Sequence, residues 1–224
     1  MKDFKKQPLI ISVLGPPGCG KGTQAKMLIN KFNLEYFGSG KSLRARQKVN
    51  DFTAKKLKIV MNKGELVPSF IISKLWIDKL EEVKKKKKFR GLLLDGSPRK
   101  RLEVKLFNGA IEWYEWDKRF KAIFIDVSKK ESISRLIKRK QCSKCGRIIP
   151  WLKGFKNFEK CDKCGGKLII RKDDNIMAIE KRWQEFNKEV MFVINLYKKE
   201  NKLIKINGEQ SIENVFKDIV KRLK

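Results

Sequence analysis

The residues most able to do chemistry form a glycine-rich loop near the start of the chain, GPPGCGKGT at residues 15–23. An apolar run, residues 9–14, precedes the loop, and a helix-like stretch, residues 24–32, follows it. In such a loop the backbone N–H groups and the helix N-terminus can surround a phosphate, and Lys21 adds a full positive charge. The pattern therefore predicts a nucleotide-binding P-loop, with a plain glycine turn as the structural alternative. Gly22 follows the lysine where Ser or Thr is usual, and the hydroxyl comes one residue later, on Thr23.

Four of the five cysteines form two pairs with the spacing of a metal site. A C-x2-C pair at residues 142 and 145 is followed, after fifteen residues, by a second pair at 161 and 164. This spacing is typical of a four-cysteine zinc site, and four thiolates would complete a tetrahedron and leave the metal structural. Iron in the same site and a redox pair are the alternatives. The predicted ligands are Cys142, Cys145, Cys161 and Cys164.

The chain is strongly basic, with 55 Lys and Arg against 25 Asp and Glu and a formal net charge of +30 in 224 residues. Such a charge favours polyanions, so non-specific binding of nucleic acid stays open. Lysine is nevertheless spread along the whole chain, and no nucleic-acid-binding module is readable, which favours a solvated basic surface.

The sequence shows neither a membrane span nor an export signal. No apolar run reaches the ~18 residues that a transmembrane helix needs. The charged start, MKDFKK, leads into the first predicted strand and is unlike a signal peptide. We therefore expect a cytoplasmic protein with no membrane partner, and we expect a monomer.

Short apolar runs alternate with helix-like stretches, and this alternation predicts an α/β fold. Because such strands are buried on both faces, we expect a parallel sheet with helices on both sides and the ligand at the carboxyl ends of the strands, where Gly15 and Asp95 fall. The five predicted strands are residues 9–14, 34–37, 91–94, 122–127 and 203–206. The predicted helices are more than one within 41–61, then 69–84, 129–140, 175–199 and 211–223.

Four motifs together resemble the adenylate kinase family, in the family's order and over nearly the whole chain. They are GPPGCGKGTQ at 15–24, LDGSPR at 94–99, RKDDN at 171–175 and INGEQ at 206–210. The family's own P-loop reads Gly-Lys-Gly-Thr, which accounts for Gly22. The cysteine segment looks like the zinc-bearing lid of many bacterial members.

The resemblance implies a P-loop NTPase fold that catalyses ATP + AMP ⇌ 2 ADP with Mg²⁺, and it implies a division of the chain. The core would comprise residues 1–37, 69–138 and 175–224, with an NMP-binding flap at 38–68 and a zinc-binding lid at 139–174. Flap and lid would close over the substrates to exclude water.

The resemblance also implies the roles of individual residues. The catalytic set would be Lys21, Asp95, Arg99, Arg139, Arg171 and Arg182, with Asp95 orienting Mg²⁺ through water. The ATP site would contain Gly18, Cys19, Gly20, Lys21, Gly22, Thr23, Arg135, Arg139, Ile148, Ile149 and Gln210. The AMP site would contain Ser39, Arg44, Glu65, Leu66, Val67, Gly96, Ser97, Pro98, Arg99, Glu103, Arg171 and Arg182. Asp173 and Asp174 would position the lid arginines and cap the helix that follows.

Three residues depart from the family pattern in the part of the chain that the resemblance assigns to AMP, the acceptor of the phosphoryl group. Lys41 stands where the family has Asp, and Ser97 stands where it has Phe, which we expect to loosen the packing. Glu103 replaces a glutamine that reads the adenine edge. An ionised Glu only accepts hydrogen bonds and would suit guanine, so an altered base selectivity is one alternative function. A weakened kinase that mainly binds RNA is the other.

Overall fold

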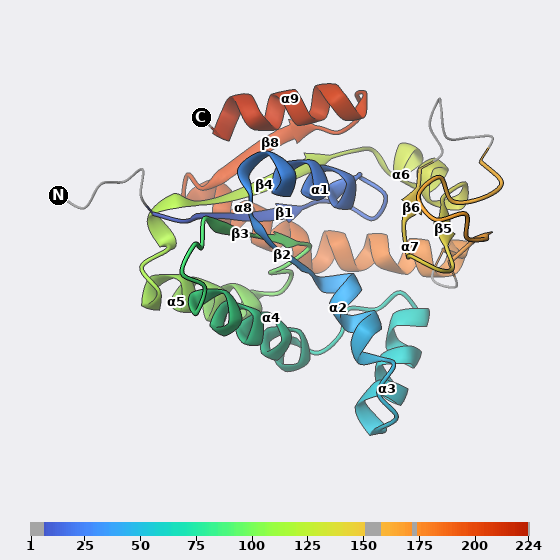
Figure 1. The fold of residues 1–224 in the computed structure, drawn as a ribbon, viewed down its shortest axis with the longest axis horizontal. Coiled ribbons are helices and arrows are strands. Elements are labelled where there is room, and N and C mark those ends of the chain that lie inside the picture. The colour runs from blue at the N-terminus through green and yellow to red at the C-terminus, as the bar shows by residue number, and fades with distance from the viewer. Residues whose placement is uncertain (1–6, 151–157, 172–173, 224) are drawn as a thin grey trace.

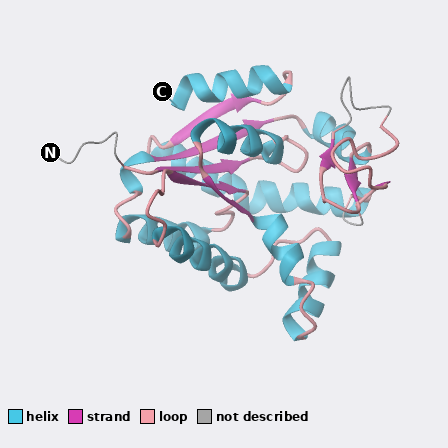
Figure 2. Ribbon diagram, in the orientation of Figure 1, coloured by secondary structure: helices cyan, strands magenta, loops and turns pink. Residues whose placement is uncertain are grey.

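A computed structural model describes residues 7–150, 158–171 and 174–223 of the chain. Its core is a five-stranded sheet in the order β2-β3-β1-β4-β8, and every pairing is parallel (Figures 1 and 2). The strands are β1 (Leu9–Leu14), β2 (Glu35–Gly38), β3 (Gly91–Asp95), β4 (Phe120–Asp126) and β8 (Leu203–Asn207). The five predicted strands are confirmed within two residues at each end, and so is the P-loop class of fold.

Helices cover both faces of the sheet. On one face, α1 (Lys21–Phe32) and α9 (Ile212–Leu223) lie against the strands, and their buried apolar side chains form one cluster with Ile11 and Val13. On the opposite face, α4 (Ser69–Lys84), α5 (Arg101–Trp113) and α8 (Met191–Lys199) enclose the larger cluster. A strand that lies between two apolar layers buries side chains on both of its faces, so its sequence is a continuous apolar run. Such runs are easy to recognise in a sequence.

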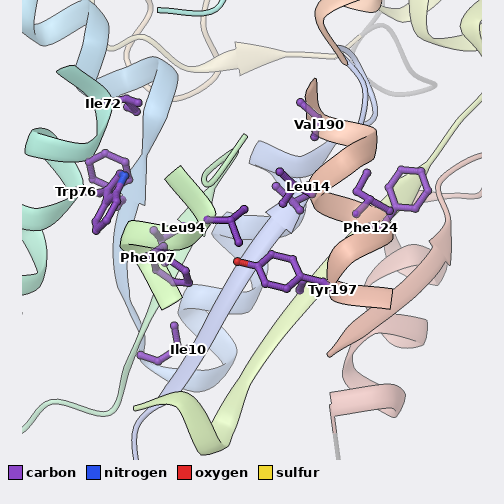
Figure 3. Close-up of a cluster of buried hydrophobic side chains, with 14 of the residues drawn as sticks. Ile10, Leu14, Ile72, Trp76, Leu94, Phe107, Phe124, Val190 and Tyr197 are labelled. Atoms are coloured by element: carbon purple, nitrogen blue, oxygen red, sulfur yellow. The ribbon is translucent and has the colours of Figure 1, made fainter. Parts of the chain in front are cut away.

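The larger cluster packs aromatic side chains against the sheet (Figure 3). Trp76 of α4 meets Phe107 of α5 edge to face, with ring centroids 5.8 Å apart. Tyr197 of α8 packs on Phe120 of β4 with centroids at 5.0 Å, and its hydroxyl donates to Asn108. These contacts fix α5, which carries the predicted site residue Glu103.

Two segments leave this core. Between β2 and α4 the chain forms α2 (Ser39–Arg46) and α3 (Phe52–Asn62), which project away from the sheet (Figure 1). Gly64, after α3, has φ +77° and lies so close to α7 (Ile176–Glu185) that an added Cβ would overlap the carbonyl oxygen of Ala178. This close approach ties the end of the insertion to the core.

The second excursion carries the cysteines and folds as a small three-stranded antiparallel sheet. Its strands are β5 (Lys140–Cys142), β6 (Ile148–Ile149) and β7 (Leu168–Ile169), in the order β6-β5-β7. It follows α6 (Lys129–Ile137) and precedes α7. Residues 151–157 and 172–173, which include the predicted Asp173, lie outside the described residues.

The long helix predicted at 175–199 is one rod with a local change of pitch. It runs as α7, then a π-helical stretch η3 (Phe186–Val190), then α8. Phe186 and Val190 of this stretch face the cavity described below. π-Helical turns of this kind concentrate at functional sites.

One helix was missed and one predicted helix cap is wrong. The sequence analysis made no prediction for α5, although this helix carries Glu103. The cap of α7 is Asn175, whose side chain accepts from the N–H of Ala178 at 2.9 Å, and Asp174 is occupied elsewhere. An Asn side chain at this position satisfies one of the unpaired N–H groups of the first helical turn.

Candidate functional site

A cavity of about 870 Å³ opens at the carboxyl ends of the strands, as expected for a parallel sheet. The P-loop, the end of β3, the insertion between β2 and α4, and the cysteine segment all contribute to its lining. The residues predicted for the catalytic, ATP and AMP sites line it, except for Ile149, Ser97 and Pro98, which are buried.

The P-loop takes the backbone conformation that glycine permits. Gly15, Gly18 and Gly20 have φ values of 152°, 80° and 90°, and Gly20 is the N-cap of α1. At Gly18 an added Cβ would come within 2.8 Å of the carbonyl oxygen of Ser132, on α6. The loop is thus shaped by positions where a side chain would be strained or would clash.

Lys21 lies folded back over the loop. Its Nζ donates to the carbonyl oxygens of Pro16 at 3.0 Å and Gly15 at 3.3 Å. Burial lowers the pKa of Lys21, while the nearby Asp95 carboxylate opposes that shift. A phosphate between the loop N–H groups would offer this ammonium a stronger partner than backbone carbonyls.

Asp95 ends β3, in register with Val13 on one side and Gly38 on the other. Its Oδ2 accepts from the hydroxyl of Tyr36 at 3.1 Å. Burial, with the adjacent carboxylate, raises the pKa of Tyr36 well above its ordinary value, so the phenol is the donor. On the other side, an added Cβ at Gly22 would lie 3.2 Å from Asp95 Oδ2, so this carboxylate lies beside the first turn of α1.

Arg99 and Glu103 form the start of α5. The Nε of Arg99 donates to the carbonyl oxygen of Gly96 at 2.6 Å, and its backbone N–H donates to Glu103 Oε2 at 2.7 Å. Glu103 is 2% exposed, and burial raises the pKa of its carboxyl group despite the hydrogen bond from Arg99. Burial also disfavours the charged form of Arg99, and for this basic group it lowers the pKa.

Asp174 joins two of the predicted catalytic arginines. It accepts from Arg139 through both oxygens, at 2.6 to 2.9 Å, and from Arg182 at 3.1 Å. Its side chain is fully buried. Burial and the neighbouring Arg171 lower the pKa of Arg139 to about 10, and Asp174 opposes the shift. Asp174 therefore contacts Arg139, at the start of the predicted lid, and Arg182, in the predicted core.

Of the residues predicted at the ATP base, Arg135 lies on α6 and Gln210 lies between β8 and α9, and both line the cavity. Arg135 Nε pairs with Glu131 at 2.6 Å, and its Nη2 donates to the carbonyl oxygen of Gly208 at 3.0 Å. Gln210 donates to Asp218 at 3.0 Å. The remaining predicted ATP residues that line the cavity are Gly18, Cys19, Gly20, Lys21, Gly22, Thr23, Arg139 and Ile148.

Ser39 organises the predicted AMP side. Its Oγ lies 2.8 Å from the carbonyl oxygen of Gly96 and 2.7 Å from Ser97 Oγ. Ser97 is 1% exposed, so this position is filled by polar contacts and the expected loosening is not seen. Lys41, in place of the family Asp, is exposed at the cavity edge. The other predicted AMP residues in the lining are Arg44, Glu65, Leu66, Val67, Gly96, Arg99, Glu103, Arg171 and Arg182.

The four predicted zinc ligands meet at one point of the cysteine segment. Their Sγ atoms all lie within 4.8 Å of one another, with 3.5 Å between Cys142 and Cys164 and 3.6 Å between Cys145 and Cys161. Tetrahedral zinc with Zn–S bonds of ~2.3 Å requires sulfurs ~3.8 Å apart, so the cluster fits the ion. The N–H of Cys145 donates to Cys142 Sγ and lowers the pKa of that thiol to about 6, which favours a thiolate ligand.

Sequence reasoning missed several lining residues. Tyr36 is the most informative, since it contacts Asp95; its signal was a tyrosine two positions before a glycine at the end of a strand. Others are Lys26, Lys48, Arg147 and Phe186.

A P-loop at the carboxyl edge of a parallel sheet, facing arginines from several segments, defines a P-loop enzyme of phosphoryl transfer. The family model described as adenylate kinase matches residues 13–202. The chain belongs to the adenylate kinase family, and it is a nucleotide-binding phosphotransferase.

Curated relatives from bacteria and archaea agree with this assignment. The adenylate kinase of Petrotoga mobilis is 36% identical over 207 residues, covering 92% of this chain and 93% of the relative. That of Pyrococcus abyssi is 34% identical over 218 residues, covering 93% of each chain. That of Methanocella arvoryzae is 36% identical over 209 residues, covering 92% of this chain and 94% of the relative.

Proposed function

We propose that this chain transfers the terminal phosphoryl group of ATP to AMP, giving two ADP. One observation carries the proposal: the P-loop lysine and five arginines line a single cavity. The arginines are Arg44, Arg99, Arg139, Arg171 and Arg182. Phosphoryl transfer depends on positioning and on neutralising charge spread over the transferring group, which is what converging guanidinium groups supply.

The donor side is the P-loop with the residues near α6 and α9. Residues 18–23 would hold the ATP phosphates, and Lys21 would leave its carbonyl partners for the transferring phosphoryl group. Arg135, Ile148 and Gln210 would contact the adenosine part. Ile149 would support Ile148 from the buried side of β6.

The acceptor side is the insertion and the start of α5. Arg44 and Arg99 would hold the AMP phosphate, while Ser39, Gly96 and residues 65–67 would form the nucleoside pocket. One oxygen of Glu103 is engaged by the backbone of Arg99, and the other could accept from the adenine amine. Ser97 and Pro98 are buried and would support the AMP pocket indirectly, through the hydrogen bond between Ser97 and Ser39.

Mg²⁺ fits the carboxylate of Asp95, because this ion prefers oxygen ligands and is usually held through one or two carboxylates and its own waters. When bound with ATP, the ion would neutralise phosphate charge. Asp95 would orient it from the edge of the sheet, beside Lys21 and the first turn of α1.

The moving parts would be a flap at 38–68 and a lid at 139–174, on a core of residues 1–37, 69–138 and 175–224. Closure would bring Arg139 and Arg171 over the phosphates and exclude water. We include Zn²⁺ as the lid's structural metal, because a segment with three strands of two or three residues has little core of its own.

Among the described residues, no helix is long and apolar enough to cross a membrane. Reduced cysteine ligands suit a reducing compartment, and we place the enzyme in the cytoplasm on that ground. One chain supplies both substrate pockets, which supports a monomer as the functional unit.

Neither alternative function finds support. The relatives described above are all adenylate kinases. Among the described residues, seven arginines line the nucleotide cavity, where phosphoryl transfer would use positive charge without any RNA.

A coupled assay with ATP and AMP tests the proposal. We expect Mg²⁺-dependent ADP formation in the wild type and a loss of at least about 100-fold in kcat for Lys21→Met, because the charge acts on the transferring group. Lys31→Met, on the exposed side of the same helix, is the matched control and should keep full activity. Activity in Lys21→Met close to the wild type, or a preference for GMP over AMP, would contradict the proposal.

A further inference from the structure

Tyr36 reaches the carboxylate of Asp95 along the surface of β2. Tyr36 and Gly38 are two residues apart on this strand, so their side-chain positions share one face of the sheet. Gly38 pairs in register with Asp95 on β3. The Tyr36 ring crosses the space above Gly38, and its hydroxyl donates to Asp95 Oδ2 at 3.1 Å.

Gly38 is needed for this contact. Its φ of −113° and ψ of 110° are ordinary extended values that any residue can adopt, so the backbone does not require glycine here. An added Cβ would instead overlap the Tyr36 hydroxyl and approach the ring carbon Cζ to 2.7 Å. The absent side chain at position 38 makes room for the phenol.

Asp95 is held from a second side by α1. An added Cβ at Gly22 would lie 3.2 Å from the same Oδ2 that accepts from Tyr36. The carboxylate is therefore confined between the first turn of α1 and the phenol, with Lys21 nearby.

Few acidic side chains of the described lining could orient a cation besides Asp95. Of the described lining residues, the carboxylates are Glu65, Asp95 and Glu103. Glu103 is turned to the N–H of Arg99, and position 41, at the cavity edge, is a lysine. Asp95 thus stands beside the P-loop without a second carboxylate from position 41 to share the orientation of a cation.

We propose that Tyr36 is a positioning residue that fixes the Asp95 carboxylate for Mg²⁺–nucleotide, with Gly38 as the position that admits it. The inference rests on the proposed function, because it assigns the hydrogen bond to the metal step of that reaction. A phenol that donates to one carboxylate oxygen fixes the rotation of the group and leaves its other oxygen to meet a hydrated cation.

The first test is Tyr36→Phe, which removes only the hydroxyl. Mn²⁺ would replace Mg²⁺ as a paramagnetic probe and be titrated by electron paramagnetic resonance in the presence of AMP and a non-hydrolysable ATP analogue. We expect Mn²⁺ binding to weaken about three- to tenfold, the size of one typical intramolecular hydrogen bond. Binding of the ATP analogue without metal should be unchanged.

Tyr197→Phe is the matched control. It removes the hydroxyl of another buried tyrosine, one that donates to Asn108 in the larger core cluster. It should lower thermal stability and leave Mn²⁺ binding as in the wild type. If Tyr36→Phe lowers stability in the same way and leaves Mn²⁺ binding unchanged, the residue is structural and the inference is wrong.

The second test is a double-mutant cycle with Gly38→Ala. Alone, this change should displace the phenol and weaken Mn²⁺ binding as much as Tyr36→Phe does. In a Tyr36→Ala background, which leaves space for the new methyl group, Gly38→Ala should have no further effect on Mn²⁺ binding. Additive effects would overturn the assignment of Gly38.

The outcomes separate this inference from the proposed function. If the wild type forms ADP from ATP and AMP, and Tyr36→Phe, Gly38→Ala and Tyr36→Ala all bind Mn²⁺ as the wild type does, only the role of Tyr36 fails. If the wild type forms no ADP, the proposed function itself fails, whatever the Mn²⁺ titrations show.

Discussion

At the scale of single residues, Glu103 has two opposing effects on the stability of the folded protein. Its carboxylate accepts from the N–H of Arg99 and so helps to begin α5. Its burial at 2% exposure costs the charged form much of its hydration, and the net result is a raised pKa. The charged form is therefore the costly one in the folded protein.

This cost predicts a pH-dependent stability difference between the wild type and Glu103→Gln. Above the raised folded-state pKa the wild type carries the full penalty, and the penalty shrinks as the pH falls toward 4.5, the ordinary value of the group. Glu103→Gln has no ionisation at this site. We expect the variant to be the more stable at pH 7 to 8, by up to about 1 kcal/mol, with the difference vanishing near pH 4.5.

Urea unfolding from pH 4.5 to 8 measures this difference. Glu65→Gln, also in the cavity lining but half-buried, serves as the control and should show a smaller change. A difference for Glu103→Gln that does not vary with pH would contradict the expectation.

The chemistry of the site was predictable from the sequence at the residue scale because motifs fix residue type and order together. Lys21, Asp95 and Arg99 follow directly from their motifs and line one cavity. Tyr36 was not predictable, because its role depends on the register between β2 and β3 and on the space above Gly38.

At the scale of elements, the strands were predictable and α5 was not. The three central strands, β3, β1 and β4, are apolar on both faces, which leaves a continuous signal. In α5 the buried Val104, Phe107 and Ile111 alternate with exposed apolar residues, Leu102, Leu106 and Trp113, which blur the helical stripe. Its N-cap, Lys100, is also not a usual capping residue. The strands of the cysteine segment, at two or three residues, are too short to leave a pattern.

The cap of α7 gives a prediction at the same scale. Asn175→Ala removes the side chain that accepts from the N–H of Ala178, and we expect the free energy of unfolding to fall by about 1 kcal/mol. Asn195→Ala, at an exposed position inside α8, is the control and should be neutral or slightly stabilising, because Ala is the better helix former. Thermal unfolding of both variants measures the difference.

An equal loss in the two variants would show that α7 does not depend on this cap. In that case the start of the helix would be held by Asp174 and its arginines instead.

At the scale of the whole molecule, the cysteine cluster and the two apolar clusters are separate sources of stability. The apolar clusters lie on the faces of the five-stranded sheet, while the thiols hold a small sheet that projects beyond it. Loss of the metal should therefore unfold the projecting sheet and leave the core folded.

We expect one metal ion per chain by elemental analysis, and we expect zinc. Treatment with a strong chelator, followed by its removal and an assay in excess Mg²⁺, should show no phosphoryl transfer and should leave the cysteine segment sensitive to protease, with far-UV circular dichroism largely retained. Added zinc should restore activity, and Cys145→Ser should resemble the chelated protein. Full activity in a metal-free preparation would contradict the structural role.

The helix α7 has a consequence for communication across the cavity. Asp174, which lies just before α7, accepts from Arg139 at the start of the cysteine segment, and Ala178 in the first turn of α7 abuts Gly64 of the insertion. One helix, α7, thus contacts both the insertion and the cysteine segment. A bulkier residue at position 64 would press on the first turn of α7, and a change in the insertion would then also affect the part of the cavity that the cysteine segment lines.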